Sequence, residues 1–130
     1  MKENLSILLV EDDLVDQMTV KRAFKDLQIT NRLDITGNGL EALELLRSGA
    51  ALPCIILLDL NMPKMNGIEF LRELRKDEKL IGLPVVVFTT SNEDSGRIES
   101  LKLNVAGYII KPLDYDRFVE VIRTIYNYWT

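Results

Sequence analysis

The chain has 130 residues, with 16 Lys and Arg against 20 Asp and Glu, one cysteine and no histidine. The net charge of −4 argues against a protein that binds nucleic acid through a basic face, and the missing histidine excludes histidine catalysis and an internal phosphohistidine. Its apolar runs are far shorter than the roughly 20 residues of a membrane span, and one cysteine cannot form an internal disulfide. We therefore expect one cytoplasmic domain over residues 1–130, without an output domain.

Predicted strands alternate with segments in which apolar residues recur at helical spacing. The strands are predicted at residues 6–10, 32–36, 54–58, 85–88 and 108–110. The intervening helices are marked by Leu14, Met18, Phe24 and Leu27, then Leu40, Leu43 and Leu46, then Ile68, Leu71 and Leu74, then Ile98 and Leu101, and finally Phe118, Val121, Ile122, Ile125 and Trp129. Continuous apolar strands in this alternation predict an α/β fold with a five-stranded parallel sheet covered on both faces. Right-handed crossovers make the sheet doubly wound, and 2-1-3-4-5 is a common strand order that alternation alone does not fix.

Polar side chains follow four of the five predicted strands. They are Glu11-Asp12-Asp13, Asp59, Thr89-Thr90-Ser91 and Lys111. Ligands of open parallel sheets bind at the carboxyl ends of the strands, near the point where the strand order reverses. In the order 2-1-3-4-5 that point lies between the first and third strands, so we expect the acids after the first strand to face Asp59.

Carboxylates gathered in this way repel one another, by roughly 4 kcal/mol for a pair about 4 Å apart at an effective dielectric constant of 20. Such a site favours a cation, and oxygen ligands suit Mg²⁺. With a hydroxyl and a lysine nearby, the group indicates a phosphoryl site with a carboxylate nucleophile. Taken singly, each residue has an ordinary explanation, and Asp13 is better explained as a helix N-cap than as a metal ligand.

Several motifs together resemble the receiver domain of two-component response regulators, over the whole chain. They are Leu8-Leu9-Val10-Glu11-Asp12, Leu57-Leu58-Asp59-Leu60-Asn61-Met62-Pro63, Met65-Asn66-Gly67, Phe88-Thr89 and Tyr108-Ile109-Ile110-Lys111-Pro112. The resemblance implies a flavodoxin-like fold of five strand–helix units that acts as a phosphoacceptor rather than as an enzyme.

The resemblance also implies a role for each matching position. Asp59 would accept the phosphoryl group, Thr89 would be the switch hydroxyl, Lys111 would pair with the phosphate, and Tyr108 would be the switch aromatic. Mg²⁺ would be held by Glu11 (through water), Asp12, Asp59 and the backbone carbonyl of Asn61. The peptide bond between Lys111 and Pro112 would be cis, and Asn61 and Ser91 would tune hydrolysis.

A narrower similarity concerns the small response regulators that are paired with cyanobacterial phytochromes. It rests on Thr89-Thr90-Ser91, Leu103-Asn104-Val105, Tyr108-Ile109, Lys111-Pro112 and Tyr128-Trp129. It implies a sensor histidine kinase of the phytochrome type as partner, although similar regulators serve other kinases. The output face would comprise the helix at Ile98 and Leu101, the strand at 108–110 and the last helix. That face would contact an unidentified downstream protein, and we expect no nucleic acid or membrane partner.

The last predicted helix carries two apolar stripes. The first comprises Phe118, Val121, Ile122, Ile125 and Trp129, and we expect it to pack inward. The second comprises Tyr115, Val119, Ile122, Tyr126 and Trp129. Because Tyr and Trp are enriched in interface cores, the second stripe predicts a homodimer through the output face, with Tyr126 or Trp129 near the two-fold axis. The alternative is that these aromatic residues cover the sheet edge of a monomer.

Three other functions compete with this interpretation. A phosphatase of the haloacid dehalogenase type needs an acid two residues after the nucleophile, where this chain has Asn61. A flavodoxin-like electron carrier needs a phosphate-binding loop after the first strand, where Glu11, Asp12 and Asp13 would repel phosphate. A receiver that has lost phosphorylation would lack key residues, whereas all of the matching positions are filled here.

Overall fold

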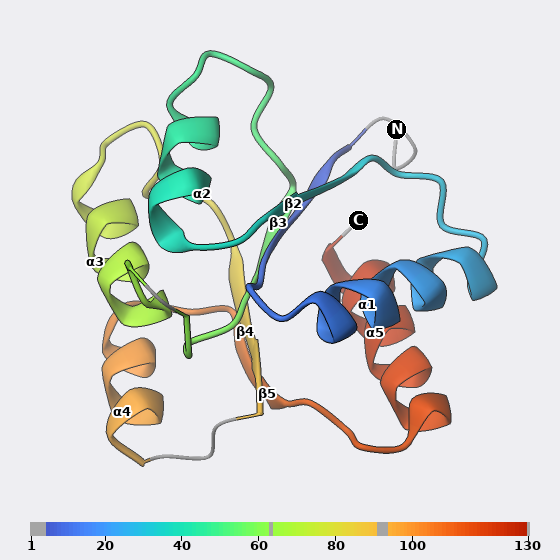
Figure 1. The fold of residues 1–130 in the computed structure, drawn as a ribbon. Coiled ribbons are helices and arrows are strands. Elements are labelled where there is room, and N and C mark those ends of the chain that lie inside the picture. The colour runs from blue at the N-terminus through green and yellow to red at the C-terminus, as the bar shows by residue number, and fades with distance from the viewer. Residues whose placement is uncertain (1–4, 63, 91–93, 130) are drawn as a thin grey trace.

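The computed structural model describes residues 5–62, 64–90 and 94–129, with only the backbone of residues 94–96 and 98. Within these residues, strands and helices alternate along the chain as predicted (Figure 1). The strands are β1 (Ile7–Val10), β2 (Leu33–Thr36), β3 (Ile55–Leu58), β4 (Val85–Thr89) and β5 (Gly107–Ile110). The helices are α1 (Leu14–Asp26), α2 (Gly39–Leu46), α3 (Gly67–Lys76), α4 (Asp94–Lys102) and α5 (Tyr115–Trp129).

The strands form one parallel sheet in the order β2-β1-β3-β4-β5, which confirms the predicted fold class and strand order. Helices α2, α3 and α4 cover one face, and α1 and α5 cover the other (Figure 1). The central strands β1, β3 and β4 are buried along their whole length, whereas β2 and β5 at the edges are mostly half-buried. This burial explains why the central strands read as continuous apolar runs.

Two apolar cores lie on either side of the sheet, because successive strand residues point to opposite faces. Leu8 of β1 belongs to the core under α2 and α3, and its neighbour Leu9 belongs to the core under α1 and α5. On α3, Phe70 and Leu74 are fully buried in the first core. Each such side chain contributes roughly 1.5–3 kcal/mol through the area that it removes from water, so the two cores hold the strand ends in place.

Polar side chains cap the starts of α1, α2 and α3. Asp13 caps α1, with Oδ1 accepting from the backbone N–H of Val15 at 2.8 Å and of Asp16 at 3.2 Å. Asn38 caps α2, and Asn66 forms a capping box with Glu69 at the start of α3. The prediction that Asp13 is an N-cap is therefore confirmed.

Some local expectations differ from the structure. Leu14 and Met18 are 71% and 67% exposed, so the buried face of α1 is formed by Val20, Ala23 and Phe24 instead. The single cysteine, Cys54, precedes β3 and is only partly buried. The peptide bond between Lys111 and Pro112 is not cis, because no cis bond occurs among the described residues. Trans is the ordinary form even before proline, by about 0.5–1 kcal/mol.

Two tyrosines of the second apolar stripe of α5 form hydrogen bonds within the chain, one to α1 and one to the segment that follows α1. The Tyr126 hydroxyl donates a hydrogen bond to Oδ1 of Asn31 at 2.9 Å, and the Tyr115 hydroxyl donates to Oδ2 of Asp26 at 2.6 Å. Val119 and Tyr126 also pack against the core on this face of the sheet. Tyr126 thus has a hydrogen-bond partner in its own chain, and its placement near a dimer axis stays a prediction.

Arg75 of α3 ties two loops together at the amino-terminal end of the sheet. Its Nε donates to the carbonyl of Leu103 at 2.7 Å, and its Nη2 donates to that of Asn104 at 3.1 Å. Its Nη1 donates to the carbonyls of Ile81 and Leu83, each at 3.1 Å. The guanidinium thereby fixes the chain before β4 and the chain before β5 to the same helix.

Helices in the described ranges are all too short or too polar to cross a bilayer.

Candidate functional site

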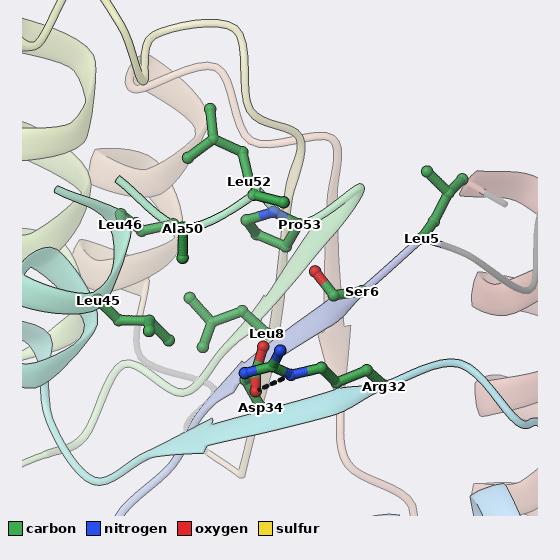
Figure 2. Close-up of a pocket in the computed structure, with 11 residues that line it drawn as sticks. Leu5, Ser6, Leu8, Arg32, Asp34, Leu45, Leu46, Ala50, Leu52 and Pro53 are labelled. Carbon is green, nitrogen blue, oxygen red and sulfur yellow. Dashed lines mark hydrogen bonds and ion pairs between the residues drawn. The ribbon is translucent and has the colours of Figure 1, made fainter. Parts of the chain in front are cut away.

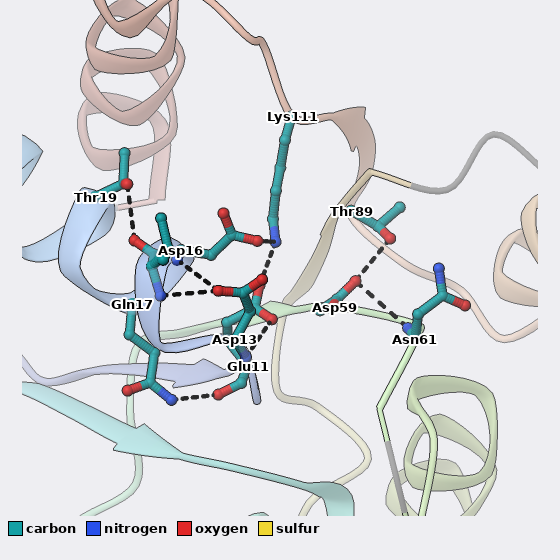
Figure 3. Close-up of polar contacts among 10 residues, drawn as sticks. Glu11, Asp13, Asp16, Gln17, Thr19, Asp59, Asn61, Thr89 and Lys111 are labelled. Carbon is teal, nitrogen blue, oxygen red and sulfur yellow. Dashed lines mark hydrogen bonds and ion pairs between the residues drawn. The ribbon is translucent and has the colours of Figure 1, made fainter.

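Four buried polar side chains meet at the carboxyl-terminal edge of the sheet (Figure 3). Glu11 follows β1, Asp59 follows β3, Thr89 ends β4 and Lys111 follows β5. They are between 0% and 8% exposed, in a chain whose other acids and lysines are mostly at the surface. Charged groups are rarely buried unless they are paired, so this edge is a built polar site rather than a set of loop ends.

Three carboxylates lie close enough to share a cation. Glu11, Asp12 and Asp59 each offer an oxygen, and these oxygens lie within 4.8 Å of one another. Glu11 and Asp59 are buried, and Asp12 is exposed at the mouth of the site. An all-oxygen group of this kind fits a hard divalent cation, whose charge would offset the repulsion among the acids. Asp13 is occupied as the cap of α1 and stands outside this group.

Asp59 is held by a hydroxyl and by a backbone amide. The Thr89 Oγ1 donates to Asp59 Oδ1 at 2.7 Å, and both residues are buried. The backbone N–H of Asn61 makes a longer contact to the same oxygen at 3.4 Å. The side chain of Asn61 is exposed beside the site. The hydroxyl expected near the acids is thus that of Thr89, which contacts Asp59 from the neighbouring strand.

Lys111 enters the site from β5 and binds two carboxylates. Its Nζ donates to Oε1 of Glu11 and, at 2.9 Å, to Oδ2 of Asp16 in the first turn of α1. Burial by itself would lower the pKa of Lys111, but the hydrogen bonds to Glu11 and Asp16 outweigh it and raise the pKa. Asp16 is therefore a site residue that the sequence analysis missed.

The pKa of Glu11 is raised from 4.5 to about 7. Burial is the main cause, because it removes water from the carboxylate. The hydrogen bond and charge of Lys111 oppose this effect, whereas the charge of Asp59 adds to it. A further positive charge in the site would therefore stabilise the ionised form of Glu11.

The start of α3 presses against the backbone of the site. A Cβ at Gly67 would lie 2.7 Å from the carbonyl oxygen of Asp59 and 2.7 Å from the Cα of Leu60. The Gly67 N–H donates to the Leu60 carbonyl at 3.1 Å. Only glycine fits here without displacing the segment that carries Asp59, which explains the third residue of the motif Met65-Asn66-Gly67.

Two other predicted site residues are Tyr108 and Ser91. Tyr108 is half-buried on β5 and packs against the core on the α2–α3–α4 side. Ser91 falls outside the described residues. For Asp16, the sequence offers no signal beyond an acid in the first turn of a helix, which is common for electrostatic reasons.

A cavity lies at the opposite edge of the sheet. It has a volume of about 250 Å³ and is lined at the amino-terminal ends of the strands by Leu5, Leu8 and Pro53, with the ion pair of Arg32 and Asp34 at 2.8 Å on its wall (Figure 2). Its lining is largely apolar and includes none of the site residues. This cavity is therefore separate from the polar group at the carboxyl-terminal edge.

Comparisons with known proteins agree with this geometry. The chain is 39% identical over 127 residues to the probable methanogenesis regulatory protein FilR2 of Methanothrix harundinacea, covering 95% of this chain and 82% of that protein. It is 35% identical over 128 residues to response regulator Rcp1 of Synechocystis sp., covering 95% and 87%.

Solved structures extend the likeness to three dimensions. The phosphorylated cyanobacterial phytochrome response regulator RcpA superposes with a TM-score of 0.90 at 32% identity, covering 97% of this chain and 94% of that one. The Mn²⁺-bound form of response regulator Rcp1 superposes with a TM-score of 0.87 at 35% identity, covering 96% and 94%. Residues 7–123 match the response regulator receiver domain as a family. The chain belongs to the response regulator receiver domain family, and its acidic group has the composition of a phosphoacceptor and metal site.

Proposed function

We propose that this chain is a phosphorylation switch in which Asp59 accepts a phosphoryl group from a partner histidine kinase. The observation that carries the proposal is the buried contact of Asp59 with Thr89, inside a group that also contains Glu11, Asp12 and Lys111. A carboxylate nucleophile, a hydroxyl donor and an ammonium are the parts that phosphoryl transfer requires. The chain has no histidine, so the phosphohistidine must come from another protein.

In the proposed reaction, a carboxylate oxygen of Asp59 bonds to phosphorus in line with the bond to the donor histidine. The phosphorus–nitrogen bond breaks, and its electron pair stays on the imidazole nitrogen of the donor. The product adds about one unit or more of negative charge at Asp59. Lys111 pairs with the phosphoryl oxygens, and the Thr89 hydroxyl turns from the carboxylate to donate to one of them. Hydrolysis returns Asp59 and inorganic phosphate, and no other substrate is turned over, so the protein is not an enzyme in the usual sense.

Mg²⁺ is the proposed cation of the site. Glu11, Asp12 and Asp59, together with the backbone carbonyl of Asn61, would hold it, and their all-oxygen composition fits that ion. When bound, it supplies positive charge that offsets the charge on the transferring phosphoryl group. The similar protein Rcp1 is known in a Mn²⁺-bound form, which supports a divalent cation as a ligand of this chain.

We propose that the kinase docks on the exposed start of α1. Leu14, Val15 and Met18 are 71%, 70% and 67% exposed, and Leu14 lies two residues after Asp12. Exposed apolar side chains gathered in this way are typical of protein contact surfaces. Because they border the mouth of the site, a partner seated on them would bring its phosphohistidine toward Asp59. The similarity to a phytochrome response regulator favours a kinase of the phytochrome type.

The proposed output is a change at the face formed by α4, β5 and α5. Movement of Thr89 toward the phosphoryl group would leave space behind β4, which Tyr108 of the adjacent strand β5 would fill. An apolar groove of about 370 Å³ lies on this face, lined by residues that include Ile109, Val121 and Tyr128. A second copy of the chain is its proposed occupant, since a two-fold axis would set these apolar side chains against their own copies. An unidentified downstream protein would read the phosphorylated state.

The proposal is tested by phosphorylation with a histidine-phosphorylated donor protein and Mg²⁺, followed by mass spectrometry of peptides. One base-labile phosphoryl group is expected on Asp59, and none on Asp59→Asn. Asp34→Asn serves as a matched control, because Asp34 is a carboxylate that lines the cavity at the opposite edge of the sheet. A label that persists in Asp59→Asn would exclude Asp59 as the acceptor.

A further inference from the structure

Lys111 lies between two carboxylates that come from different elements (Figure 3). Its Nζ donates to Glu11 after β1 and to Asp16 on α1, the latter at 2.9 Å. The Lys111 and Glu11 side chains are 5% and 1% exposed, whereas that of Asp16 is 29% exposed. Of the two carboxylates, Asp16 is therefore the one that water can solvate again if the lysine leaves.

The carboxylate of Asp16 serves neither as a member of the acidic group nor as the cap of α1. It stands outside the group of Glu11, Asp12 and Asp59, and Asp13 already caps the helix. Its side chain nevertheless points back toward the site and meets the ammonium at the end of β5 (Figure 3). The contact joins residues 95 positions apart in the chain, so it is a tertiary contact and not a local helix pair.

We propose that Asp16 is a positioning residue that retains Lys111 beside Glu11 and thereby sets how readily the lysine moves to a phosphoryl group on Asp59. The inference rests on the phosphoacceptor function proposed above. An ammonium has three N–H donors, and the phosphoryl oxygens on Asp59 compete with Asp16 and Glu11 for them. Each carboxylate that must be given up opposes the transfer of the lysine, so the charge on Asp16 works against the phosphorylated state.

The test compares the rate of phosphorylation by phosphoramidate, a small donor, in the presence of Mg²⁺. Asp16→Asn removes the charge and is expected to raise the second-order rate constant at least about threefold, the scale of one partly exposed ion pair. Asp16→Glu restores a carboxylate that can reach Lys111 and is expected to return the rate toward the wild-type value. Asp13→Asn removes a charge three residues away but keeps a good N-cap, so it measures the effect of net charge alone.

Two further readouts separate positioning from a merely structural role. Mg²⁺ affinity of Asp16→Asn should stay within about twofold of wild type, because Asp16 is outside the acidic group. Denaturant unfolding of Asp16→Asn and Asp16→Glu should be alike, although their rates differ.

Three results would overturn the inference: an Asp16→Asn rate at or below wild type, an equal acceleration in Asp13→Asn, or an Asp16→Glu rate equal to that of Asp16→Asn. If the wild-type protein takes no label on Asp59, the proposed function itself fails. If it does, the three rate comparisons decide whether Asp16 restrains Lys111, and the Mg²⁺ affinity and unfolding measurements decide whether its effect is structural.

Discussion

The hydroxyl of Thr89 lies 2.7 Å from Oδ1 of Asp59, and both side chains are closed off from water. The hydroxyl thus sits at the strand end where phosphorylation would add charge. We predict that Thr89→Ala still accepts a phosphoryl group on Asp59 but transmits it weakly, because the donor that would follow the phosphoryl group is gone. Loss of this buried hydrogen bond should also cost about 1 kcal/mol of unfolding free energy.

Hydrogen–deuterium exchange of β5, measured with and without phosphorylation, reports this transmission. The change in protection at Gly107–Ile110 should shrink in Thr89→Ala and persist in Thr89→Ser, which keeps the hydroxyl. An undiminished response in Thr89→Ala would contradict the switch role of this residue.

The geometry of the acidic group predicts that Asp12 is a direct ligand of Mg²⁺. Asp12→Ala should weaken Mg²⁺ binding about tenfold or more, equivalent to about 1.4 kcal/mol or more, because a direct ligand is removed. Asp13→Asn is the matched control, since its carboxylate caps α1 and stands outside the group. Calorimetric titration of both variants with Mg²⁺ measures the two affinities. Equal affinities would show that Asp12 is not a ligand.

The raised pKa of Glu11 predicts a pH-dependent stability in the metal-free protein. The folded carboxyl titrates at about 7 and the unfolded one near 4.5, so the folded state binds more protons between these values. The contribution of Glu11 to stability is fully present below pH 4.5 and is lost as the pH rises through about 7. Bound Mg²⁺ favours the ionised carboxylate and should remove most of this loss.

Urea unfolding from pH 5 to pH 8 (about the range of the titration), with chelator or with Mg²⁺, checks the sign. Glu11→Gln provides the control, because it cannot ionise, and the difference between wild type and Glu11→Gln isolates this group from the other acids. If the unfolding free energy of the metal-free wild type rose relative to that of Glu11→Gln with increasing pH, the predicted direction of the pKa shift of Glu11 would be wrong.

The contacts of α5 give a sharper test of self-association than the sequence did. Tyr128 is 78% exposed and lines the apolar groove, whereas Tyr126 is bonded to Asn31 within the chain. Tyr128→Glu should therefore give a folded monomer, because it places a charge in the proposed interface. Tyr126→Phe should remain a dimer and lose about 1 kcal/mol of stability with its hydrogen bond. Sedimentation at micromolar concentration distinguishes them, and a wild-type protein that stays monomeric in both phosphorylation states would assign the groove to another protein.

Much of the fold could be predicted because the sequence patterns that indicate its strands and helices each lie within one short segment of the chain. The continuous apolar strands at residues 54–58 and 85–88 indicated buried parallel strands, and the polar residue after each of them marked the ligand edge of the sheet. Element boundaries differ by a residue or two from the prediction, as at Cys54, which precedes β3. The strand order was expected only as a common solution for doubly wound sheets, since alternation is compatible with several orders.

The remaining features depend on contacts between distant residues, which periodicity does not encode. The partner of Lys111 on α1 follows from how that helix crosses the sheet, so Asp16 resembled an ordinary first-turn acid. The four carbonyl contacts of Arg75 join loops that no pattern connects. The exposure of Leu14 and Met18 escaped prediction because their spacing on a helix does not say which face meets the core.

The glycine at the start of α3 has a consequence for how variation in this protein should be understood. Gly67 offers no functional group, yet the space where its Cβ would lie is filled by the backbone of Asp59 and Leu60. The backbone of Asp59 and the start of α3 are therefore in direct contact, so that neither can shift at this point without the other. A screen for loss of signalling should recover substitutions at position 67 as well as at position 59. A substitution at position 67 would displace the carboxylate of Asp59 without changing its chemical reactivity.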